Sequence, residues 1–143
     1  MTRCTLALTF FGAIVMLHCT PKSDAVKMSG NPVLEGWYAD PEGAIFGDRY
    51  WIFPTYSARF EDQVFFDAFS SEDLVNWQKH SRILDTSRVS WGWRAMWAPC
   101  VVEKSGKYFL FFGVNDVQKP QNDWYEAGVN DSGGIGVAIA ASP

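Results

Sequence analysis

An aspartate that stands between aromatic residues and a proline is the group in this sequence best suited to chemistry. Asp40 follows Trp37 and Tyr38 and precedes Pro41. Because proline disfavours the helical region for the preceding residue, Asp40 is predicted to be extended or in a turn. Carboxylates act as general acids or bases, and aromatic faces suit ligands with apolar faces. The Asp-Pro dipeptide is more often a structural turn, so by itself it assigns no function.

Further candidates lie towards the C-terminus. Trp97, in a Trp-Ala-Pro segment, could present its ring face to a ligand or fill a gap in the core. Asn115 and Asp116 follow a predicted strand and could contact a ligand or cap a loop. The acidic residues between positions 123 and 131 do not have the spacing of an EF-hand, so we predict no metal site. The sequence has no glycine-rich phosphate loop and no Ser/His/Asp set.

Short β-type runs separated by turn residues must position these side chains. Residues 44–46 and 50–53 flank Gly47-Asp48, which is a hairpin signal. Residues 65–70 are predicted to form a third strand, and residues 77–80 an outer fourth strand. Since no segment of this region has sustained helical periodicity, the sequence predicts an all-β fold.

A second hairpin, at residues 101–112, repeats the first in register. Pro41 matches Pro99, and nine residues later Tyr50 matches Tyr108. The third strand recurs as well, because residues 65–71 resemble residues 135–142 once an inserted loop at 118–134 is allowed for. The repeat starts with Ala98-Pro99 where the first copy has Asp40-Pro41, so it offers no substitute carboxylate.

Repeats of this length, each a small antiparallel sheet, are typical of β-propellers. The inner strands of a propeller line its central channel, so Asp40 is expected to point toward a ligand site. We count one whole blade and most of a second, whereas at least about three repeats are usually needed for stability. The chain is therefore expected to be incomplete as a propeller.

Four motifs, in order, resemble glycoside hydrolase family 43, whose members are five-bladed β-propellers. The resemblance extends over residues 31–143, and the closing residues 134–138 are similar to the family's blade-two strand. The motifs are Tyr38-Ala39-Asp40-Pro41, Tyr50-Trp51-Ile52-Phe53, Ser71-Glu72-Asp73-Leu74-Val75-Asn76-Trp77, and Met96-Trp97-Ala98-Pro99 followed by Gly106-Lys107-Tyr108.

The resemblance implies inverting hydrolysis of α-L-arabinofuranosyl or β-D-xylosyl linkages in plant cell-wall polysaccharides or oligosaccharides. It makes Asp40 the general base, and Trp97, Tyr38 and Asn115 substrate-binding residues. A second Asp in blade three and a Glu in a later blade would complete the machinery, and neither position exists in this chain, so the chain alone is expected to be inactive. We expect no cofactor, because the ligands of the calcium ion found in some members are also outside this sequence.

The N-terminus predicts export. Arg3 precedes an uncharged, largely apolar run at residues 4–17, which has the length of a signal-peptide core and is shorter than a membrane span. Residues 1–19 are expected to be a signal peptide and residues 20–30 a linker. Cys19 stands where a lipoprotein signal places its lipidated cysteine, although the preceding residues are not small; lipidation and ordinary cleavage both remain open. A lipid anchor at Cys19 would be the expected membrane attachment, and the protein is expected in the periplasm, at the cell surface or secreted.

Composition narrows the class of partner. The net charge is −4 and no run of Lys or Arg occurs, so nucleic acid is excluded as an expected partner. Aromatic residues make up 16% of the chain, which suits a neutral ligand such as a sugar. Two alternatives to a glycosidase stay open: a non-catalytic carbohydrate-binding propeller and an inactive truncated product.

Overall fold

The computed structural model describes residues 27–116 and 133–143. The predicted signal peptide, the lipidation site at Cys19 and most of the predicted inserted loop lie outside these residues, so they stay predictions. The described residues form seven strands and two short 3-10 turns. The predicted all-β class is confirmed.

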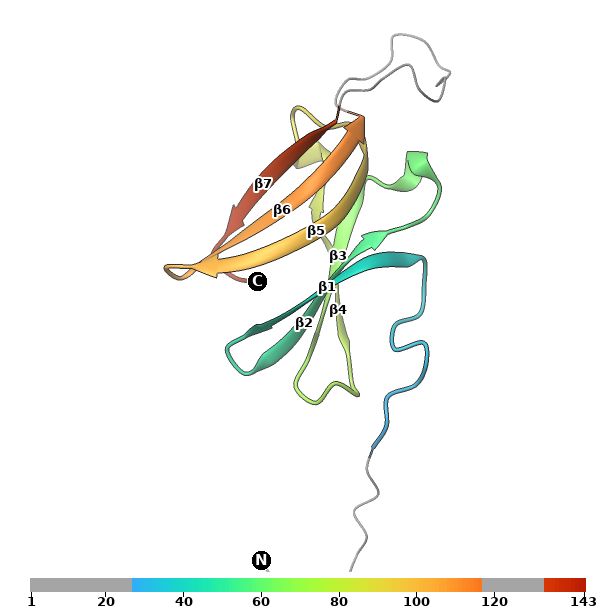
Figure 1. Cartoon of the computed structure of the whole chain (residues 1–143), viewed down its shortest axis with the longest axis vertical. Coiled ribbons are helices and arrows are strands. Elements are labelled where there is room, and N and C mark those ends of the chain that lie inside the picture. Colours follow the sequence, from blue (N-terminus) through green and yellow to red (C-terminus); the bar gives the residue numbers. More distant parts are fainter. Residues whose placement is uncertain (1–26, 117–132) are drawn as a thin grey trace, which may run out of the picture.

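The first sheet is the predicted first blade. Its strands are β1 (Tyr38–Phe46), β2 (Arg49–Tyr56), β3 (Phe65–Ser71) and β4 (Gln78–Asp85), antiparallel and paired in chain order (Figure 1). Gly47 has a φ of 62° in the turn between β1 and β2, a conformation that glycine adopts without steric cost. Both β1 and β4 are longer than the hydrophobic pattern predicted, because strand pairing continues through polar residues at their ends.

The second sheet contains three strands of the predicted second blade. These are β5 (Arg94–Lys104), β6 (Lys107–Asp116) and β7 (Gly134–Ala140), again antiparallel and in chain order. The repeat extends to the backbone, since Gly106 in the β5–β6 turn has a φ of 72°. The 3-10 turns η1 (Phe60–Asp62) and η2 (Thr86–Arg88) lie in the connections that follow β2 and β4.

One core joins the two sheets. Phe66 of blade one and Met96 and Val114 of blade two are each at most 1% exposed. The rings of Phe66 and Phe112 meet edge to face across the interface, with centroids 5.7 Å apart. Burial of each large apolar side chain contributes about 1.5–3 kcal/mol, so this shared core fixes the relative placement of the blades.

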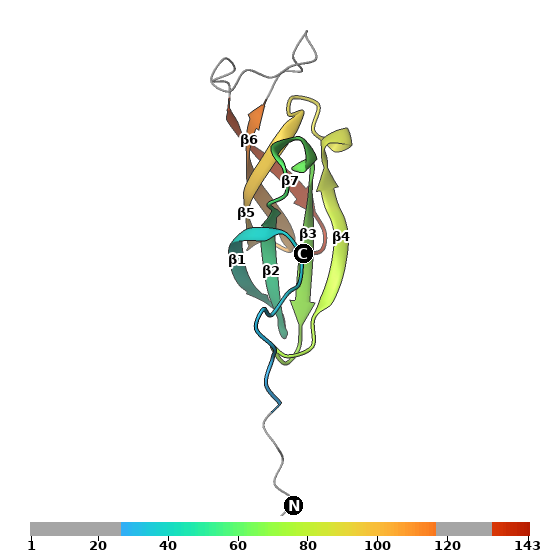
Figure 2. The ribbon, with the colours of Figure 1, turned by 90° about the vertical axis from the view of Figure 1, so that its right-hand side faces the viewer.

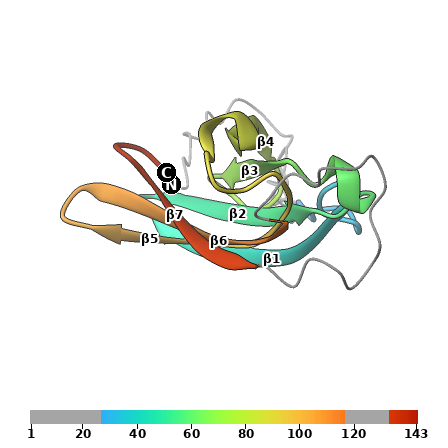
Figure 3. The ribbon, with the colours of Figure 1, turned by 90° about the horizontal axis from the view of Figure 1, so that it is seen from above.

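The two strands that begin with the candidate motifs lie next to each other. β5 packs against both β1 and β2. Figures 2 and 3 show β1 and β5 together on one side of the molecule, with β4 on the other side. This arrangement brings Asp40 of β1 and Trp97 of β5 to the same edge, as expected for the inner strands of two successive blades.

Candidate functional site

Asp40 lies at a β-bulge near the start of β1. The pairing register between β1 and β2 shifts between Ala39 and Glu42, so Asp40 and Pro41 stand outside the ladder. The φ of Asp40 is 46°, in the left-handed region, so of the two predicted conformations, extended or turn, the extended one is wrong. Aspartate tolerates this conformation better than most residues. The bulge turns the carboxylate out of the sheet, where it is exposed.

A buried hydroxyl holds this carboxylate. Thr55 Oγ1 donates a hydrogen bond of 2.9 Å to Asp40 Oδ2. The same oxygen accepts a bond of 2.7 Å from the backbone N–H of Ala98, the residue after Trp97. Through Thr55, the bulge of blade one is therefore tied to the Trp-Ala-Pro segment of blade two.

Trp97 and Asn115 form a pair on blade two. Trp97 Nε1 donates to Asn115 Oδ1 at 3.0 Å, and the Trp97 side chain remains 40% exposed. The ring lies across Gly113, its partner on β6, because a Cβ atom at Gly113 would stand only 2.8 Å from Trp97 Nε1. Asn115 lies within β6, which runs to Asp116, and not after the strand as predicted. The Trp97 ring is thus held by Asn115 and Gly113 and is partly open to solvent.

Tyr38 is directed into blade one. Its hydroxyl donates to Asp67 Oδ2 at 2.7 Å and accepts a bond of 2.9 Å from Lys79 Nζ. The carboxylate of Asp67 is 2% exposed and forms an ion pair of 2.8 Å with Lys79. Burial raises the pKa of the Tyr38 phenol. The predicted role of Tyr38 in substrate binding stays a prediction, and its observed contacts anchor the start of β1.

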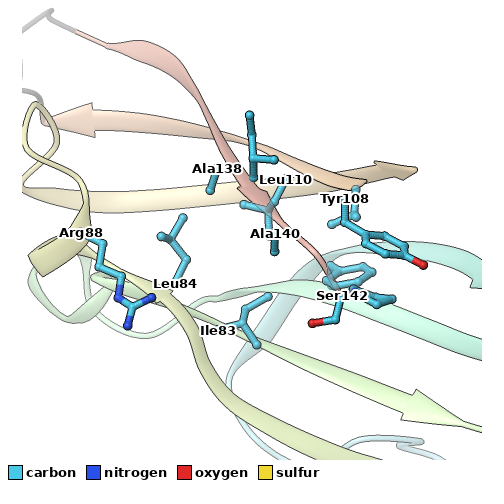
Figure 4. Close-up of a pocket in the computed structure, with 12 residues that line it drawn as sticks. Ile83, Leu84, Arg88, Tyr108, Leu110, Ala138, Ala140 and Ser142 are labelled. Atoms are coloured by element: carbon cyan, nitrogen blue, oxygen red, sulfur yellow. The ribbon is translucent and has the colours of Figure 1, made fainter. Parts of the chain in front are cut away.

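A cavity of about 420 Å³ lies elsewhere, between the outer parts of the two blades (Figure 4). Ile83, Leu84 and Arg88 line it from blade one, facing Tyr108 and Leu110 of blade two. None of the predicted site residues lines it. The chemistry of a carboxylate and an open aromatic face therefore belongs to the β1–β5 edge and not to this cavity.

The described part of the chain contains neither a cluster of metal-ligating side chains nor a membrane-spanning helix. Within residues 27–116 and 133–143, no three His, Cys, Asp or Glu side chains come together as metal ligands would. Over the same residues, no helix has the length and apolar character needed to cross a bilayer.

Comparison with known proteins assigns the chain to a family. The sequence profile of glycosyl hydrolases family 43 matches residues 29–143. The chain belongs to this family. The recognised motifs and the predicted propeller class are thereby confirmed, and the two sheets are blade one and three strands of blade two of its five-bladed propeller.

Named relatives give the scale of the match. The chain is 44% identical to a β-D-galactofuranosidase, xynD, of Aspergillus niger, covering 80% of this chain and 38% of that protein. It is 29% identical to a xylosidase/arabinosidase of Bacteroides ovatus, over 75% of this chain and 33% of the relative. The solved structure of the β-xylosidase RS223 superposes with a TM-score of 0.59 at 25% identity, over 76% of this chain and 33% of that one. The chain thus spans about a third of the length of these family 43 proteins.

Thr55 was not among the residues predicted from the sequence. It ends the apolar run of β2, where a polar residue attracts little notice, although its side chain is 2% exposed. The repeat could have drawn attention to Thr55, because the register that matches Pro41 with Pro99 also matches Thr55 with Gly113, so the two blades differ at this position. Both residues face the bulged strand of their own blade, Thr55 opposite Ala39 and Gly113 opposite Trp97.

Proposed function

We propose that these blades form the general-base side of the active site of an inverting glycosidase. The observation that carries the proposal is the exposed Asp40 carboxylate, held by Thr55 beside the segment that presents Trp97. A carboxylate held by a neutral donor at an exposed edge can take a proton from water. The activity is proposed for the protein in which these blades are joined to the remainder of a propeller.

In the proposed reaction, Asp40 deprotonates a water molecule that attacks the anomeric carbon. A carboxylic acid on the other side protonates the departing oxygen, about 6.5–9.5 Å from the base in inverting enzymes. By family resemblance this acid is a Glu of a later blade, and an Asp of blade three positions it. Both would come from outside the sequence printed here.

The proposed substrates are furanosides or xylosides of plant cell-wall polysaccharides and oligosaccharides. The names of two relatives, a β-D-galactofuranosidase and a xylosidase/arabinosidase, support α-L-arabinofuranosyl, β-D-xylosyl or galactofuranosyl linkages. The exposed ring of Trp97 supports a sugar ligand, since aromatic faces stack on sugar C–H bonds.

A chimaera tests this function. Residues 29–143 replace the aligned segment of the A. niger relative, and hydrolysis of 4-nitrophenyl furanosides and xylosides is followed, with product configuration read by NMR. We expect hydrolysis with inversion at the anomeric carbon. A folded chimaera that binds oligosaccharides without hydrolysing any of these glycosides would instead favour a carbohydrate-binding propeller. In that case Trp97 and Asn115 could bind the sugar without a catalytic role for Asp40. Retention of configuration would contradict an inverting base.

The same chimaera tests whether the contacts of Asp67 with Tyr38 and Lys79 stabilise the start of β1. Burial alone would raise the pKa of Asp67, but bonds from Lys79, the Arg82 amide and Tyr38 outweigh it and hold the pKa below its usual range. Stability from a lowered carboxyl pKa is present above the unfolded value, about 3.9, and is lost as pH falls through the folded value. We expect Asp67→Asn to lower the free energy of unfolding by about 2 kcal/mol at pH 7.

Thermal unfolding between pH 7 and pH 3 measures this effect. The difference between parent and Asp67→Asn is expected to narrow as the pH falls below about 4. Asp62→Asn is the matched control, because Asp62 pairs with Arg59 in a largely exposed i,i+3 contact and is expected to matter by less than about 0.5 kcal/mol. If the stability difference between the parent and Asp67→Asn grew as the pH fell, the lowered pKa of Asp67 would be contradicted.

A further inference from the structure

Thr55 stands between the proposed base and the second blade. Its side chain is 2% exposed, and it lies opposite Ala39 on the neighbouring strand. Its hydroxyl oxygen is 2.9 Å from Asp40 Oδ2 and 2.7 Å from the amide nitrogen of Ala98. Thr55 thus contacts both bulged segments, one in each blade.

The direction of the two hydrogen bonds follows from chemistry. An amide N–H can only donate, so the Thr55 oxygen must accept the bond from Ala98. A hydroxyl has one proton, and a carboxylate can only accept, so that proton goes to Asp40 Oδ2. Accepting the Ala98 bond polarises the hydroxyl and strengthens its bond to the carboxylate. The Asp40 side chain remains exposed while Oδ2 accepts this bond.

The internal repeat allows the Thr55 position of blade one to be compared with the matching position of blade two. Ala98 occupies the position of Asp40 in blade two and has the same φ of 46°. The position of Thr55 is there taken by Gly113, and the space is filled by the ring of Trp97. The bulge of blade two therefore forms with no threonine at the matching position of its own sheet, and its Ala98 amide bonds instead to Thr55 of blade one. The hydroxyl lies in the blade whose bulge carries a carboxylate.

We propose that Thr55 is a positioning residue that fixes the Asp40 carboxylate and couples it to the Trp97 segment. The proposal rests on the proposed role of Asp40 as general base. Threonine suits the task because its branched Cβ restricts χ1, so the hydroxyl stays aimed at both partners.

Thr55→Val and Thr55→Ser in the chimaera test the proposal. Valine keeps the shape and loses the hydroxyl, so we expect kcat per folded protein to fall about 10- to 100-fold with KM within about twofold. Serine keeps the hydroxyl, and its kcat is expected within about threefold of the parent. Thr55→Ala is a second variant without the hydroxyl, should Thr55→Val fold poorly. Equal activity of the valine and serine variants, or a large loss in the serine variant, would overturn the proposal.

A double-mutant cycle with Asp40→Asn separates positioning from structure. If Thr55 acts through the carboxylate, Thr55→Val has no further effect on kcat once Asp40 is asparagine. Additive losses would show that Thr55 acts by another route, and the inference would fail. Failure of Asp40→Asn itself to lower kcat would instead overturn the proposed function, so the two failures are distinguishable.

Discussion

Asp40→Asn is expected to lower kcat of the chimaera by about 10²–10⁴-fold, the usual contribution of general-base assistance, while KM stays near the parent value. Asparagine has nearly the shape of aspartate, and its carbonyl oxygen can still accept the bond from Thr55 Oγ1. It cannot take a proton from water. The loss is therefore expected in the chemical step and not in the melting temperature.

Steady-state kinetics and thermal unfolding of the same preparations measure both quantities. Asp48→Asn is the matched control, because Asp48 lies exposed in the turn at the other end of the same hairpin. Azide is expected to restore part of the rate in Asp40→Asn by attacking from the face that water used. A lowered melting temperature with unchanged kcat per folded protein would make Asp40 a structural residue.

The isolated chain is expected to self-associate and to unfold over a broad temperature range. One face of blade two is apolar and open: Ile135, Val137 and Ile139 are 77%, 52% and 60% exposed, and Phe111 and Val102 are 40% and 45% exposed. Strand pairing places Phe111 opposite Val137 and Val102 in the row of Ile139, so the side chains share one face. Soluble monomers rarely expose contiguous apolar patches above a few hundred Å².

Sedimentation velocity on residues 29–143 measures the association. Val137→Thr combined with Ile139→Thr keeps the β-branched shape and is expected to shift the population toward monomer. Ile45→Thr is the control, because Ile45 is 67% exposed but lies on blade one. A monomeric parent with a sharp two-state transition would contradict the expectation.

Short-range sequence patterns predicted much of the fold. Turn glycines and alternating apolar residues are read within a few positions, so the two hairpins and their repeat could be predicted. Strand ends could not, because pairing of Tyr38 and Ala39 with β2 extends β1 beyond the bulge at Asp40 and Pro41, two residues that lack β propensity. His80, expected at the end of a strand, lies inside β4 for the same reason and contacts Ser70.

The sequence by itself determined the all-β class, the blade repeat, the family motifs and Asp40 and Trp97 as candidate residues. Each of these features depends on residue types and on spacings along the chain, and both can be read without knowing which distant segments come into contact. Only the tertiary structure decided that Asp40 has a left-handed backbone, that Tyr38 bonds to Asp67 and Lys79, and that Thr55 joins Asp40 to Ala98. Thr55 and Ala98 are far apart in sequence and meet only because the shared core seats β5 against β1 and β2, and no local pattern encodes such a contact.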